Sequence, residues 1–67
     1  MNKKEKLSIY ADFLNLCGEI LSGKAEKEDI EKLTEAMVKS GQRDLMKKEL
    51  KDISKIIIAK RKRENND

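Results

Sequence analysis

The chain has 67 residues, of which 43% are charged and 37% hydrophobic, and its net charge is +3. This length gives room for one domain with a small core, and one cysteine with no histidine excludes an internal disulfide and the common histidine-containing zinc sites. Proton transfer at neutral pH most often uses histidine, and a nucleophilic serine or cysteine needs a nearby base. We therefore predict no enzymatic activity, no catalytic residue, no cofactor and no metal site.

The apolar residues recur at helical spacing, so an all-α fold is predicted despite the high charge content. There is no proline, and Gly23 and Gly41 each follow a periodic segment, where they suit the left-handed position that ends a helix. Three helices are predicted, at about residues 3–22, 26–39 and 42–63. They belong to one domain that spans residues 1–67 and ends in a polar disordered tail at residues 64–67.

The first predicted helix carries two apolar stripes that lie ~100° apart. One stripe consists of Leu7, Tyr10, Leu14, Cys17 and Leu21, and the other consists of Ile9, Phe13, Leu16 and Ile20. An apolar surface this broad usually contacts two neighbours. The opposite half, which includes Ala11, Asp12 and Gly18, is assigned to solvent. We interpret Cys17 as a small buried hydrophobe in a reducing compartment, which favours a cytoplasmic location.

The second predicted helix has one narrow apolar stripe, made of Ile30, Leu33 and Met37. Two oppositely charged pairs stand four residues apart on it, Glu28 with Lys32 and Glu35 with Lys39. The acidic residues near its start suit the positive end of the helix dipole, so they are interpreted as helix chemistry and not as a calcium site. This segment is predicted to be a solvated helix that covers the core.

The third predicted helix is the longest, at ~33 Å, and its C-terminal turns should project beyond the shorter second helix. Its apolar residues within a ~140° arc are Leu45, Met46, Leu50, Ile53, Ile56 and Ile57, and Met46, Leu50, Ile53 and Ile57 have heptad spacing. Ile58 falls outside that arc. We expect the first and third helices to form the main pair, with the second crossing between them.

More apolar surface is predicted than three helices can cover, and this favours contact with a larger protein, with a second copy of the chain, or with both. A closed bundle that leaves Ile58 as an ordinary exposed residue is the alternative. The residues expected at a partner interface are Ile53, Ile56, Ile57 and Ile58 in the third helix and Ile9, Phe13, Leu16 and Ile20 in the first. The first-helix group is the expected face of a homodimer.

Positive charge is concentrated in residues 42–67, which hold nine basic and five acidic residues, a net charge of +4. The candidate phosphate-contacting residues are Lys51, Lys55, Lys60, Arg61, Lys62 and Arg63. A solvated end that complements the helix dipole explains the same charges without a ligand. Tyr10 and Phe13 are the only aromatic residues and belong to the apolar stripes, so stacking on bases is not expected.

The leading hypothesis is a small non-enzymatic interaction protein, which acts as a regulator, adaptor or inhibitor through protein–protein contact. Small helical proteins that are rich in lysine and glutamate and poor in aromatic residues are often encoded by bacteria, phages or mobile elements. This is an analogy at the level of fold. The second hypothesis is a nucleic-acid-binding accessory protein. A membrane partner is disfavoured, because no run approaches 18 uncharged apolar residues, the basic start lacks a signal-peptide pattern, and the third helix lacks aromatic anchors.

Overall fold

Three helices make up the structure, a computed structural model that describes residues 2–65. They are α1 at Lys3–Leu21, α2 at Lys27–Lys39 and α3 at Arg43–Asn65, and no strand occurs within these residues. The predicted all-α class is confirmed. The first two helices match the predicted ranges to within a residue at each end, and α3 continues two residues past the predicted end at 63. Residues 66–67 of the predicted polar tail lie outside the described residues.

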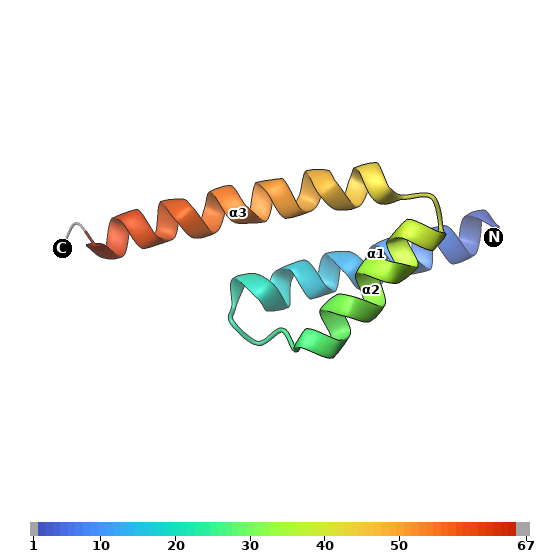
Figure 1. Cartoon of the computed structure of the whole chain (residues 1–67), viewed down its shortest axis with the longest axis horizontal. Coiled ribbons are helices and arrows are strands. Elements are labelled where there is room, and N and C mark those ends of the chain that lie inside the picture. Colours follow the sequence, from blue (N-terminus) through green and yellow to red (C-terminus); the bar gives the residue numbers. More distant parts are fainter. Residues whose placement is uncertain (1, 66–67) are drawn as a thin grey trace.

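The helices form an elongated unit of 49 × 21 × 15 Å in which α1 and α3 run in the same direction (Figure 1). α2 runs back in the opposite direction and crosses α1 near its own C-terminal end (Figure 1). α3 extends past the loop that joins α1 to α2, as predicted (Figure 1). The most extensive contacts are those between α1 and α2. The prediction that α1 and α3 form the main pair is therefore wrong, because the short turn after α1 folds α2 directly back onto it.

The glycines end α1 and α2 in the same way. Gly23 and Gly41 have φ angles of 75° and 76°, a left-handed conformation that side chains disfavour. At the end of α2, Gly41 donates its N–H to the carbonyl of Val38 at 3.1 Å, and Gln42 donates to Met37 at 2.9 Å. The corresponding pair of hydrogen bonds surrounds Gly23. Both helices thus close with a Schellman motif, and the predicted glycine positions are confirmed.

Two polar side chains fix the starts of helices, Asn2 at α1 and Gln42 at α3. Asn2 caps α1, since its Oδ1 accepts a hydrogen bond from the backbone N–H of Glu5 at 2.8 Å. Gln42, in the turn between α2 and α3, donates from Nε2 to the carbonyl oxygen of Lys6 at 3.1 Å and to Oγ of Ser40 at 2.7 Å. Gln42 thus ties the start of α3 to the first turns of α1.

The core contains five fully buried apolar residues, which are Phe13, Leu16 and Cys17 from α1, Met37 from α2 and Ile53 from α3. Partly buried residues surround them, namely Ile9, Tyr10, Ile20, Leu21, Ala25, Ile30, Leu33, Met46, Leu50 and Ile57. The narrow stripe predicted for α2 and the heptad series predicted for α3 are both among these residues. The core is small, so much of each helix remains at the surface.

Candidate interaction surfaces

The α1 residues predicted to form a homodimer face do not lie together at the surface. Phe13 and Leu16 are 0% and 2% exposed, and Ile9 and Ile20 are partly buried against the same core. α2 and α3 cover this side of α1. The four residues of the predicted homodimer face therefore belong to the internal packing, which corrects that prediction. Both α1 stripes are apolar, and the positions of α2 and α3 decide which residues of each are covered; Cys17 of the first stripe is also buried in the core.

The apolar surface that α1 leaves open lies on its other flank. Leu7, Ala11, Leu14 and Gly18 are exposed and Leu21 is partly buried, and together they occupy an arc of ~80°. No charged residue between Leu7 and Leu21 falls within that arc. Leu7, Leu14 and Leu21 repeat every seven residues, with the small Ala11 and Gly18 between them. The sequence signal was present, but Ala11 and Gly18 were assigned to the solvated half.

α3 continues this open surface across its contact with α1. Tyr10 Oη donates a long hydrogen bond of 3.5 Å to Oε1 of Glu49, which joins the two helices. On α1, Tyr10 lies between the core and the leucine series, and on α3, Glu49 lies between the core and the exposed Leu45 and Ile56. The leucine series of α1 and the exposed residues Leu45 and Ile56 of α3 therefore face the same side of the molecule. We call this surface the apolar face; it consists of Leu7, Ala11, Leu14, Gly18, Leu21, Leu45 and Ile56.

The four α3 isoleucines predicted as one interface are distributed around the helix. Ile53 is buried and Ile57 is partly buried in the core, whereas Ile56 and Ile58 are 51% and 54% exposed. Residues two positions apart on a helix point ~200° away from each other, so Ile56 and Ile58 lie on opposite flanks. Ile56 belongs to the apolar face, and Ile58 is isolated from it.

A surface groove of about 570 Å³ lies where α3 runs past the end of α1. Its apolar lining comes from Ile20, Leu21, Ile56 and Ile57, and its polar lining from Ser22, Gly23, Lys60, Arg61 and Glu64. Lys60 and Arg61 outnumber the one carboxylate of Glu64. The predicted proximity of isoleucines and dense positive charge is therefore present here, next to one end of the apolar face.

The basic residues of α3 also separate by direction. Consecutive residues on a helix point ~100° apart, so Lys60, Arg61, Lys62 and Arg63 face four different sides. Lys51, Lys55 and Lys62 share one side with two further lysines. We call this group the lysine ridge; it consists of Lys47, Lys48, Lys51, Lys55 and Lys62, all exposed. Within residues 2–64, none of them has a carboxylate oxygen within 4.0 Å, and the ion pair found there joins Glu35 to Lys39.

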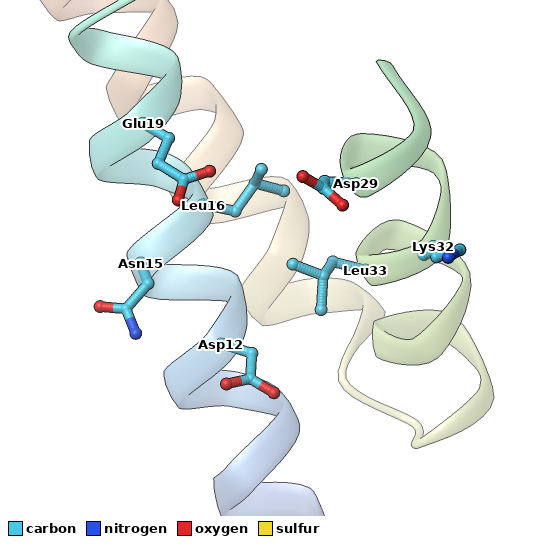
Figure 2. A pocket seen from close by; sticks show the side chains of 7 residues that line it. All are labelled: Asp12, Asn15, Leu16, Glu19, Asp29, Lys32 and Leu33. Atoms are coloured by element: carbon cyan, nitrogen blue, oxygen red, sulfur yellow. The ribbon is translucent and has the colours of Figure 1, made fainter. Parts of the chain in front are cut away.

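A second groove separates α1 from α2 and is acidic. Figure 2 shows Leu16 and Leu33 facing one another across it, with the carboxylates of Glu19 and Asp29 on one side and that of Asp12 on the other. No group of three or more potential ligands in residues 2–65 is arranged to hold a metal ion. Nor does any helix in that range combine the length and apolar character needed to cross a membrane.

Two of the described groups have perturbed pKa values, and both lie near Glu49: Cys17 is in the core, and Tyr10 is partly buried beside it. Burial raises the pKa of the Cys17 thiol above its ordinary value of 9.0, and the negative charge of Glu49 raises it further. Burial likewise raises the pKa of Tyr10, to which the charge and the hydrogen bond of Glu49 also contribute. Thiolate chemistry requires a lowered pKa and access to solvent, and Cys17 has neither. Its environment matches the predicted packing role.

Comparison with protein-family models, with curated proteins and with solved structures finds no match to this chain.

Proposed function

We propose that the chain is a small non-enzymatic interaction protein, a regulator, adaptor or inhibitor, that holds a helix of another protein against the apolar face. One observation carries this proposal. Among the described residues, Leu7, Leu14, Val38, Leu45, Ile56 and Ile58 are the exposed large hydrophobic residues, and four of these six belong to the apolar face. Single exposed apolar residues are ordinary on soluble proteins, whereas several that open to one side of a small domain favour a contact site.

The face has the chemistry of a helix-docking surface. Three leucines at heptad spacing alternate with Ala11 and Gly18, where an added Cβ on Gly18 would meet no atom within 4 Å. Side chains of an incoming helix fit into such hollows between leucines, and apolar anchors every three or four residues supply most of the binding energy. Lys60 and Arg61 at one end of the face favour a helix that carries acidic residues there.

A second copy of the chain is one partner that fits. The series Leu7, Ala11, Leu14, Gly18 and Leu21 reads nearly the same in both directions around Leu14. When two α1 helices pack antiparallel across a two-fold axis at Leu14, Leu7 of each copy lies opposite Leu21 of the other. The small residues Ala11 and Gly18 lie between the leucines. A chain with so small a core gains stability from this added burial. We therefore retain the homodimer as part of the proposal, with the apolar face in place of the stripe that contains Phe13.

The test compares one substitution in the face with a matched substitution outside it. Leu14→Asp places a charge at the centre of the face, and Val38→Asp places the same charge on α2, where Val38 is 48% exposed and Leu14 is 41% exposed. Light scattering over a range of concentrations measures the mass of each variant. We expect a dimer for the parent chain and for Val38→Asp, and a monomer for Leu14→Asp with unchanged helix content.

A parent chain that stays monomeric directs the test to other proteins. Displayed helical peptides are then selected for binding, and their affinity for the parent chain and both variants is measured by fluorescence anisotropy. The proposal predicts at least a tenfold loss for Leu14→Asp and no loss for Val38→Asp. If Leu14→Asp changes neither the mass nor peptide binding, the apolar face is not the site. A reducing compartment such as the cytoplasm is the location we propose, because Cys17 is a buried free thiol.

A further inference from the structure

The geometry of α3 points to a second binding surface: we propose that the lysine ridge contacts the phosphate backbone of double-stranded nucleic acid without reading its sequence. This inference goes beyond the proposed function and does not depend on it. On α3, the centre of the ridge lies ~120° around the helix from Leu45 and Ile56, so the two surfaces open in different directions.

The ridge is a continuous line of positive charge. Its five lysines fall within an arc of ~100° and run for about 22 Å along the helix axis from Lys47 to Lys62. Ile58 is the one apolar residue inside the arc. Asp44 is the one acidic residue in it, and Asp44 precedes the ridge in the first turn of α3, where the helix dipole favours a negative charge.

The spacing of the ridge lysines destabilises α3. Lys47, Lys51 and Lys55 follow one another at four-residue spacing, which places like charges next to each other on the helix surface and destabilises the helix. α2, which has the same solvated character, intersperses acids and bases and forms the Glu35–Lys39 ion pair at 2.9 Å. A polyanion laid along the ridge relieves this repulsion, which no other group within residues 2–64 neutralises by close contact.

The composition of the ridge favours phosphate over other anionic partners. Helices that bind membrane surfaces add bulky aromatic anchors, and the ridge has none. Protein interfaces centre on buried aromatic or arginine residues, whereas the ridge offers exposed lysines around the single Ile58. Lysine is a flexible point charge that suits contact with phosphates of any sequence. From Lys47 to Lys62 the same arc holds no arginine, asparagine or glutamine, the residues that most often read base edges, so we expect binding to be independent of sequence.

The measurement is binding of a 20-base-pair duplex at salt concentrations from 50 to 200 mM, with a DNA arm and an RNA arm. Each phosphate contact on duplex DNA contributes about −0.9 to the slope of log affinity against log salt, so five contacts give about −4.5 and a loss of about 500-fold over this range. The variant Lys47→Gln/Lys51→Gln/Lys55→Gln removes three contacts, and we expect its slope to fall to about −1.8, a loss of about 12-fold.

The matched control is Lys4→Gln/Lys27→Gln/Lys32→Gln, which changes the net charge equally at exposed positions outside α3. We expect its slope to equal that of the parent chain. We also expect the ridge variant to keep full helix content and to melt no earlier than the parent chain, because it loses like-charge repulsion. Loss of binding then reports on contact and not on unfolding.

Three outcomes overturn the inference. The first is no binding of either duplex by the parent chain at 50 mM salt. The second is an equal reduction of slope in the control, which would mean that net charge alone attracts the duplex. The third is ridge-dependent binding to vesicles with anionic lipid headgroups but not to either duplex, which assigns the ridge to a membrane surface.

Discussion

α2 and α3 have similar proportions of charged residues, 7 of 13 and 13 of 23, but arrange them differently. On α2, Glu28 and Asp29 lie in the first turn, Lys39 lies in the last turn, and Glu35 pairs with Lys39, so these charges stabilise the helix itself. On α3, the lysine ridge repels itself and has no paired acid within the described residues. The number of charges therefore says little about function. The order in which acidic and basic residues follow one another distinguishes a helix that covers the core from a helix that presents a binding surface.

The largest expected effect tests the covering role of α2. Met37 is its one fully buried residue, and Met37→Ala should cost about 2–5 kcal/mol of unfolding free energy. A chain of this size has only about 3–10 kcal/mol, so extensive unfolding is expected at 37 °C. Ile58→Ala on the outer side of α3 should change stability by less than about 0.5 kcal/mol. Urea denaturation followed by circular dichroism measures both, and equal effects would mean that Met37 does not hold α2 against the core.

A smaller effect concerns the turn that separates α2 from α3. Gly41→Ala should destabilise the fold by about 1–2 kcal/mol, because φ is 76° there. The same substitution at Gly18, within α1, should stabilise it by about 0.5–1 kcal/mol. An added Cβ meets no atom within 4 Å at either position, so the backbone conformation alone sets the sign. Melting curves at a concentration where the chain is monomeric provide the comparison.

The smallest effect addresses charge order directly. Lys51→Glu places an acid between Lys47 and Lys55 and should stabilise the chain by about 0.5–1 kcal/mol. Glu35→Lys on α2 removes the pair with Lys39 and should destabilise it by a similar amount. Both effects should shrink in 1 M salt, because the charges are exposed. Effects of the same sign in the two helices would show that charge order does not distinguish them.

The sequence predicted the helices and their ends well, because those features depend on local chemistry. Gly23 and Gly41 mark positions that need a left-handed backbone, and the heptad series of α3 identifies its buried side. The covered side of α1 was assigned less well, since Leu14 and Phe13 belong to different apolar stripes and the choice depends on where α2 and α3 pack. The hydrogen bond from Gln42 to Lys6 joins residues 36 positions apart and leaves no local pattern.

The candidate surfaces show the same limit. Residues 60–63 attract attention because the cations are consecutive, yet helical geometry sends them to four sides, and lysines spaced further apart in the sequence form the ridge. Leu7 and Leu14 lie in an apolar stripe that the sequence alone does not distinguish from a buried one. Three short helices do not supply enough surface to cover them.

The parallel directions of α1 and α3 have a consequence for reach. The first turns of α1 and the last turns of α3 lie at opposite ends of a 49 Å axis, with Gln42 fastening the start of α3 near one end (Figure 1). A chain this short gains from that layout the span of a much larger protein. A partner bound beside the groove at Lys60 would therefore lie at the opposite end of the molecule from Lys3.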